Sequence, residues 1–293
     1  MQSIRCPVMA DLPHFPVSRY SSASRLSDPA QFLREWKRDI FASPRIGWRL
    51  FQRGLIHQYR HSSLGIFLVF APVLIAALLF TFGRHSNLLA AEIGGVNSAF
   101  FGACGMLMGQ SFLEALNSTK RLFANNQSLF RRQNLPVEGP LLAIVIDLVF
   151  RLLIRLLVLA LLMGLFSIHP VPTAPIAAWG LLGISLAGAG LGLIAAAPSC
   201  LQQDLTVLAS ILPLVLFTVT PVFGVPAPAS LLGRIQSVNP LTWLFQGIRA
   251  AAYGGSGSVV AAAIGPVVGI LLVLLGWFIC RIARPHVVER ILV

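Results

Sequence analysis

Long runs of apolar residues fill most of the chain after Ser62, and charged residues rarely interrupt them. The hydrocarbon core of a bilayer is about 30 Å thick, so a helix needs about 20 mostly apolar residues to cross it. Of the 293 residues, 56% are hydrophobic and 11% are charged, which is less than half the charged fraction of an ordinary soluble domain. The sequence therefore predicts an all-α integral membrane protein that crosses the bilayer several times.

We expect six transmembrane helices in one membrane domain, with no second soluble domain. The expected spans are residues 64–82, 94–116, 141–166, 176–197, 205–223 and 259–280. The fourth span is rich in glycine and alanine, a composition that lets neighbouring helices approach closely.

Basic residues indicate which side of the membrane each loop occupies. Ten lysines and arginines precede the first span, four lie between spans two and three, and three follow the last span, against three on the other side. Because cytoplasmic loops are enriched in Lys and Arg, we expect a multi-pass protein of the inner or plasma membrane with both termini cytoplasmic. This distribution accounts for the net charge of +12 without a nucleic-acid partner. Residues 1–43 are expected to form a disordered or partly helical cytosolic tail, and residues 285–293 a cytosolic C-terminus.

Residues 44–61 are predicted to form an amphipathic interface helix on the membrane surface. Cationic residues recur every three or four positions, and a stripe of aromatic and aliphatic residues runs beside them. Pro44 suits the first turn of such a helix. The cationic face would contact lipid headgroups or a partner protein, and a passive surface anchor is the alternative.

Residues 225–255 are only moderately apolar and contain several prolines and glycines. Within them, a helix of about 13 residues is expected to begin at Asn239-Pro240 and to end at Gly254, and it is too short to cross the bilayer. The pattern predicts a short re-entrant or external helical pair before the last span. The alternative is a loop that lies flat on the headgroups.

The sequence carries no recognisable motif for catalysis or nucleotide binding. It lacks G-x-x-x-x-G-K-[ST], H-E-x-x-H and G-x-S-x-G, and its only lysines are Lys37 and Lys120. None of the six histidines lies inside an expected span, and the four cysteines have no metal-like spacing. We therefore expect a chain that is not an enzyme and that has no catalytic, metal-binding or cofactor-binding residue.

Three charged residues, Asp147, Arg151 and Arg155, interrupt the third span at four-residue intervals and so lie near one helix face. A charge at mid-bilayer costs about 2.5–3.5 kcal/mol, which pairing of Asp147 with Arg151 would reduce. Arg155 has no acidic partner on its own helix. Glu114 is expected at a different depth, so its expected partner is Arg121 or another protein. This face either packs structurally or lines a polar pathway or a protomer contact.

Four stretches together resemble the permease subunits of type 2 ABC exporters, especially the branch that exports O-antigen, capsular polysaccharide and teichoic acid. They are residues 48–74, residues 124–148, the Gln203-Asp204 region with the following Pro221-Val222, and residues 239–255. Residues 135–138, Leu-Pro-Val-Glu, stand where the family has Phe-Pro-Arg-Glu. Val137 and Gln203 thus replace basic residues of the family pattern.

The resemblance covers about residues 44–284, which would form the transmembrane domain, and it implies a homodimer around a central channel. An ABC ATPase subunit, which would hold ATP and Mg, would bind each permease on the cytosolic face. Residues 117–138 would form the coupling loop, with a coupling helix at 119–134 that docks into the ATPase. Residues 225–255 would form the external gate.

The resemblance and the residue pattern also give candidate site residues. Those for ATPase coupling are Leu122, Phe123, Asn126, Leu129, Phe130, Arg131, Arg132, Pro136 and Glu138. Those of the interface helix are Arg45, Trp48, Arg49, Arg53, Tyr59 and Arg60, and those of the gate are Asn239, Pro240, Trp243 and Arg249. Candidates for lining the channel are Phe67, Phe70, Phe217 and Phe223, with a core or lipid-facing position as the alternative.

The leading hypothesis is a permease that exports a lipid-linked polysaccharide from the cytosol to the outer face. One alternative keeps the fold and changes the cargo to a lipid, a drug or another small amphiphile. An alternative of another class is a membrane scaffold or assembly protein that transports nothing.

Overall fold

The computed structural model describes residues 29–60, 75, 92–93, 96–132, 136–222, 230–254 and 257–292. Within these ranges the chain is almost entirely helical, as predicted. The helices are α1 (Pro29–Arg60), α3 (Ser98–Lys120), α4 (Leu122–Asn125), α5 (Gln127–Arg132), α6 (Glu138–Leu165), α7 (Ala174–Leu201), α8 (Gln203–Val219), α9 (Leu231–Val238), α10 (Pro240–Tyr253) and α11 (Val259–Leu292). Strands β1 (Glu92–Ile93) and β2 (Val96–Asn97) form one short antiparallel pair. The first expected span, residues 64–82, lies outside the described residues apart from Ile75.

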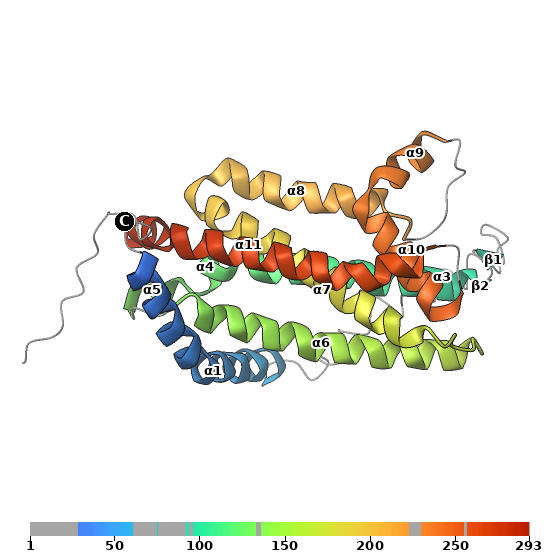
Figure 1. Ribbon diagram of the computed structural model, residues 1–293, viewed down its shortest axis with the longest axis horizontal. Helices are drawn as coiled ribbons and strands as arrows, with labels where there is room; N and C mark the ends of the chain where they lie inside the picture. Colours follow the sequence, from blue (N-terminus) through green and yellow to red (C-terminus); the bar gives the residue numbers. More distant parts are fainter. Residues whose placement is uncertain are drawn as a thin grey trace, which may run out of the picture.

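Helix α7 packs against both α3 and α11, and these long helices run along the length of the molecule with α6 (Figure 1). A Cβ atom on Gly188 would lie 2.4 Å from the carbonyl oxygen of Phe112 in α3, and one on Gly190 would lie 2.5 Å from the Cβ of Leu272 in α11. Side chains would not fit at these distances, so the glycines of α7 allow the close packing. A hydrogen bond also joins α3 to α7, because the hydroxyl of Thr119 donates to the carbonyl oxygen of Ala189 at 3.0 Å.

The two ends of the bundle carry different elements (Figure 1). One end, named here the α4–α5 end, holds α4, α5, the N-terminal part of α1 and the C-terminal part of α11. The other end, named the α9–α10 end, holds α9, α10 and the strand pair. The first and last described helices therefore reach the same end of the molecule.

Three helices among the described residues are long and apolar enough to cross a membrane: Ser98–Lys120, Ala174–Leu201 and Val259–Val287. They correspond to the second, fourth and sixth expected spans. Helix α6, with 28 residues, and α8, with 17, overlap the third and fifth expected spans. The count of six spans stays a prediction.

The helices at the two chain ends are longer than predicted. Helix α1 begins at Pro29, so Pro44 lies inside it and not in its first turn. Proline lacks an amide hydrogen and bends a helix, and α1 changes direction along its length in Figure 1. The Ser43 hydroxyl donates to the carbonyl oxygen of Asp39 at 2.5 Å, one turn before the proline. Helix α11 continues to Leu292, so most of residues 285–293 extends the last helix.

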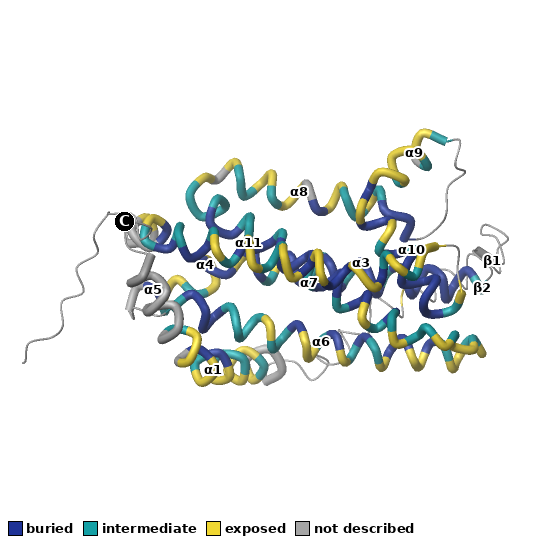
Figure 2. Tube along the Cα trace, viewed as in Figure 1, coloured by how far each residue is buried: buried dark blue, intermediate teal, exposed yellow. Residues whose placement is uncertain are grey.

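Buried residues concentrate on α3, α7 and α10, whereas α6, α8 and α11 have many exposed residues (Figure 2). The exposed residues of α6 include Leu153, Leu157, Leu161 and Leu165, which share one helix face because they are four residues apart. An apolar stripe on the outside of a helix is what contact with lipid or with another membrane helix requires.

Candidate functional site

The α4–α5 segment, residues 121–132, joins α3 to α6 as two short helices and not as the single helix predicted for residues 119–134. Asn126 separates the two helices, and its side-chain amide donates to the carbonyl oxygen of Leu122 at 2.8 Å. A side chain that bonds the backbone in this way competes with helical hydrogen bonds, which accounts for the break.

Three large apolar residues of the α4–α5 segment face inward. Leu122, Phe123 and Phe130 are at most 4% exposed, and the rings of Phe123 and Phe130 are 5.6 Å apart. They form an inner cluster with residues from the start of α6 and the ends of α7 and α11. Its other members are Val137, Leu193, Ala196, Ala197, Cys280 and Val287. Leu122, Phe123 and Phe130 therefore anchor the segment to α7 and α11, and their assignment to the ATPase contact stays a prediction.

The outward edge of the α4–α5 segment is polar. Its exposed residues include Arg121, Asn125, Gln127 and Ser128, while Asn126, Leu129 and Pro136 are half-buried. The side chains of Arg131 and Arg132 lie outside the described residues. A polar edge on a buried apolar base forms a surface that a partner can contact without unfolding the segment.

The second half of α1, which corresponds to the predicted interface helix, packs on α6. A Cβ atom on Gly47 would lie 2.9 Å from the Cβ of Leu142, so the two helices touch closely there. The ring centroid of Phe51 is 5.7 Å from that of Trp48 and 6.2 Å from that of Phe150. Trp48 is half exposed, and Arg45 and Arg49 point to the surface. The side chains of Tyr59 and Arg60 lie outside the described residues.

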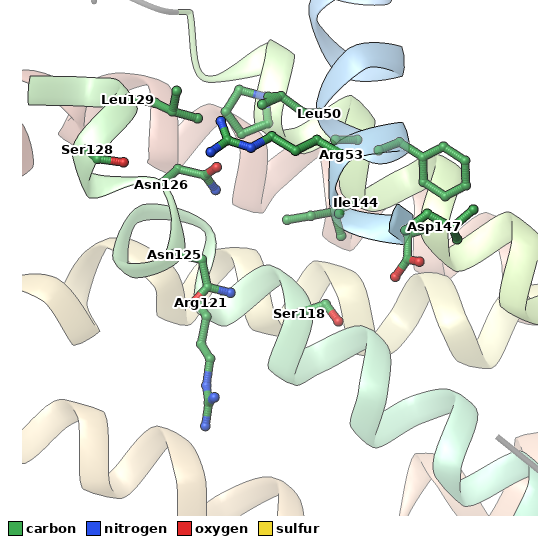
Figure 3. A pocket seen from close by; sticks show the side chains of 15 residues that line it. Leu50, Arg53, Ser118, Arg121, Asn125, Asn126, Ser128, Leu129, Ile144 and Asp147 are labelled. Carbon is green, nitrogen blue, oxygen red and sulfur yellow. The ribbon is translucent and has the colours of Figure 1, made fainter. Parts of the chain in front are cut away.

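A cavity of about 810 Å³ lies between α1, the start of α6, the end of α3 and the α4–α5 segment. Its polar lining includes Arg53, Arg121, Asn125, Asn126 and Asp147, and Leu50 and Ile144 contribute apolar surface. In Figure 3, Arg53 extends from α1 toward Asn126 and Leu129, whereas Arg121 points away from it. The interface helix and the coupling residues thus border one cavity.

A half-buried charge cluster links α3 to α6. Arg151 donates to Asp147 at 2.8 Å, which confirms the predicted pair. Glu114 forms ion pairs with both Arg151 and Arg155. The prediction that Glu114 lies at another depth is wrong, and Arg155 is buried with a 7% exposed side chain. The cluster balances two acids against two arginines, which makes their burial tolerable.

At the α9–α10 end, the predicted helical pair is present as α9 and α10. Asn239 caps α10, its side-chain oxygen accepting from the amide of Leu241 at 3.0 Å, and Pro240 follows. The Asn239 amide donates to the hydroxyl of Thr220 at 3.0 Å, beyond the end of α8. Gly254 ends α10 with φ of +80°, which favours glycine.

Arg249 is buried between α3 and the chain that follows α8. Its guanidinium donates to the carbonyl oxygens of Pro221 at 2.7 Å and Val222 at 3.0 Å, and it lies 3.7 Å from the centroid of the Phe101 ring. Burial lowers the pKa of Arg249, while nearby Tyr253 and Cys104 act in the opposite direction. Trp243 is more than half exposed. The gate candidates Asn239 and Arg249 therefore tie α10 to the end of α8.

Of the channel-lining candidates, Phe217 is half-buried on α8. Its ring rests on Gly109 of α3, where a Cβ atom would lie 1.9 Å from the ring. Phe217 therefore packs against α3, which fits the core position given as the alternative to channel lining. Phe67, Phe70 and Phe223 lie outside the described residues.

Sequence reasoning missed one cluster at the α4–α5 end. Arg281 of α11 forms ion pairs with Glu138 of α6 and Asp39 of α1. Glu138, a coupling candidate, is thus buried inside the chain. Arg281 had been counted only as a topology signal, and no local pattern pairs it with residues more than a hundred positions away. No group of three or more metal-ligating residues occurs in the part of the chain that the structure describes.

The model of the ABC-2 type transporter family matches residues 47–253, which is most of the chain. No curated protein matches it. The matched region runs from the second half of α1 to the end of α10 and so includes the α4–α5 segment, the charge cluster and the α9–α10 pair.

Proposed function

The chain belongs to the ABC-2 type transporter family, and from this premise we propose that it is a permease subunit that exports a lipid-linked polysaccharide. The family indicates a transmembrane permease and implies an ABC ATPase as its partner. Beyond the family, we propose the cargo and a homodimeric channel. We also propose that each subunit has six spans and that both of its termini lie in the cytosol. The chain itself would bind no ATP, and Mg-ATP would be held and hydrolysed by the partner.

One observation carries the transport mechanism: the α4–α5 segment has a polar outer edge fixed to an apolar base. The base includes Leu122, Phe123 and Phe130, which pack on the ends of α7 and α11. Because buried side chains are close-packed, a force on the outer edge moves the helices beneath it and does not dissipate in a loose loop. ATP-driven closure of the partner would push on this edge and change the arrangement of the long helices.

The polysaccharide cargo is supported by the resemblance of residues 48–74, 124–148 and 239–255 to the polysaccharide branch. In this proposal, α9 and α10 form the outer gate. Asn239 and Arg249 hold the end of α8 against α10 and α3, so they set how far the gate opens.

A second cargo, a lipid or another small amphiphile, is favoured by a separate feature. A cavity of about 650 Å³ between α6 and α7 is lined mainly by apolar residues, including Leu156, Leu159 and Met163, with Ser167 and His169 among them. Such a cavity fits an acyl chain better than a sugar chain.

Co-purification with substitutions on the exposed edge tests ATPase docking. Gln127→Glu combined with Ser128→Glu places two charges on that edge without touching the apolar base. We expect at least a tenfold loss of the ATPase that co-purifies with the full-length chain, which corresponds to about 1.4 kcal/mol of binding free energy. Ser258→Glu, an exposed site at the α9–α10 end, is the matched control.

Two results would contradict the proposal. If the wild-type chain never retains an ATPase, the scaffold alternative is favoured; if the edge variant retains it fully, the α4–α5 edge is not the docking surface. Cargo is tested separately, by comparing surface polysaccharide in cells with and without the chain. Unchanged surface polysaccharide together with a change in exported lipid would favour the second cargo.

A further inference from the structure

The buried guanidinium of Arg281 in α11 contacts α1 and α6 at the α4–α5 end, the end proposed to face the cytosol. The residue is 2% exposed and lies in α11, just after Cys280 of the inner cluster. Its Nη1 donates to the Glu138 carboxylate, and its Nη2 lies 3.4 Å from Oδ2 of Asp39. The indole N–H of Trp277, one turn earlier on α11, donates to Glu138 at 3.3 Å.

Glu138 and Asp39 each lie next to a feature of the proposed transport mechanism. Glu138 is the first residue of α6 and follows the α4–α5 segment. Asp39 precedes the Pro44 bend in α1, and its side chain is 17% exposed. Asp39 and Arg281 both lie outside residues 47–253, the region that matches the family. The contact therefore joins Glu138, inside the matched region, to two residues outside it.

Because its charges are buried, this contact requires that they stay paired. An isolated charge in a protein interior is costly, so Arg281 and Glu138 keep their positions only while they remain paired. A guanidinium presents donors in a planar fork and can reach two carboxylates in different directions. Arg281 therefore stabilises the arrangement in which α1, α6 and α11 are held together, and not merely one pair of helices.

We propose that Arg281 is a positioning residue that joins α1, the start of α6 and the end of α11 into one rigid unit with the α4–α5 segment. The inner cluster holds the segment on α7 and α11, and Arg281 extends this unit to α1. The proposal rests on the proposed function for its role in transport: the N-terminal part of α1 moves with the segment when the ATPase closes. The inferred unit itself is independent of the cargo.

Spin-label distances in the full-length chain in lipid nanodiscs test this unit. Labels go on Phe41→Cys of α1 and Asn125→Cys of α4, which are exposed positions, after Cys6 and Cys200 are replaced with serine. We expect one narrow distance distribution in this background. Arg281→Gln should broaden and shift it, and Arg290→Gln, an exposed arginine of the same helix, should leave it unchanged.

A milder variant covers the case in which Arg281→Gln does not fold. Asp39→Asn removes the charge on α1 and leaves the Arg281–Glu138 pair, so it should broaden the 41–125 distribution. The distance from Asn125→Cys to His286→Cys on α11 should stay narrow in this variant, because the inner cluster still holds the segment. A 41–125 distribution that stays narrow in Asp39→Asn, and in Arg281→Gln where that variant folds, would overturn the proposal.

Adding nucleotide to the co-purified complex separates positioning from simple stability. Labels at Phe41→Cys and Val260→Cys, the latter exposed at the α9–α10 end, should report a nucleotide-dependent shift in the background that has serine at positions 6 and 200. Asp39→Asn should lose that shift while still binding the ATPase; a shift of unchanged size would contradict the transport role. If no ATPase binds the wild type, the proposed function fails, but the nucleotide-free 41–125 distances still decide the rigid unit.

Discussion

The charge cluster between α3 and α6 predicts which of two acidic residues contributes more to stability. Glu114 pairs with both Arg151 and Arg155, whereas Asp147 pairs with Arg151. Glu114→Gln therefore takes the acidic partner from Arg155, whose side chain is only 7% exposed. Asp147→Asn leaves Arg151 paired with Glu114. Glu114→Gln should destabilise the protein more than Asp147→Asn.

The magnitudes follow from burial. Removing one partner of a buried ion pair costs about 3–5 kcal/mol, and the lower end applies because 30% of the Glu114 side chain is exposed. The loss of the hydrogen bond from Arg151 to Asp147 costs about 1 kcal/mol. At about 2–4 °C per kcal/mol, Glu114→Gln should lower Tm by roughly 6–12 °C and Asp147→Asn by roughly 2–4 °C.

Thermal unfolding of the purified variants, followed by intrinsic fluorescence, measures both values. The double variant Glu114→Leu, Arg155→Leu removes the uncompensated charge as well as its partner, so it should be more stable than Glu114→Gln alone. The reasoning is refuted if Asp147→Asn lowers Tm as much as Glu114→Gln, or if the double leucine variant is the least stable of the three.

Two further predictions concern packing. Gly190→Leu should disrupt the packing of α7 on α11, because even a Cβ atom would lie 2.5 Å from Leu272, whereas Gly164→Leu has open space around it and should give a normal monodisperse peak in size-exclusion chromatography. Equal profiles for the two variants would contradict the close approach. Phe130→Asp should reduce yield and thermal stability because it buries a carboxylate in the inner cluster, so it should impair folding as well as ATPase docking. A Phe130→Asp chain with wild-type stability that fails only in docking would show that the residue faces the partner.

Local signals allowed the helical pair at the α9–α10 end to be predicted closely. An Asn-Pro start and a Gly-Gly stop define a helix because each acts on the backbone next to it, and α10 begins at Pro240 and has Gly254 as its C-cap. The Asp147–Arg151 pair was predictable for the same reason, since residues four apart on one helix are neighbours.

Pairings between helices were not predictable in this way. The expectation that Glu114 and Arg155 lie at different depths assumes that α3 and α6 meet the membrane surface at the same level. The α4–α5 segment separates the ends of these helices, so residue counts give no shared depth, and Glu114 meets Arg155. Arg281 illustrates the same limit, because its partners are set by packing of distant segments.

The packing of the inward face of the α4–α5 segment was also not predictable from the sequence. The sequence shows that Leu122, Phe123 and Phe130 form an apolar group, but not which surface covers it. A short helix buries its apolar residues on the nearest apolar surface, and in this chain that surface is the ends of α7 and α11. The residues of the segment that stay exposed include polar ones, such as Gln127 and Ser128.

The contacts at the two ends of the bundle together indicate where a conformational change would occur. The inner cluster joins the α4–α5 segment to α7 and α11, and α7 packs along α3, so these elements form one body. Helix α8 is different, since Val207, Leu208, Ile211, Leu214 and Val215 are exposed along its length. Its C-terminal end is held by Asn239 and by the bonds from Arg249 to the residues that follow it. Movement of the body at the α4–α5 end would therefore reach α8 at the α9–α10 end, where a few polar contacts can exchange partners at less cost than a packed core can be rearranged.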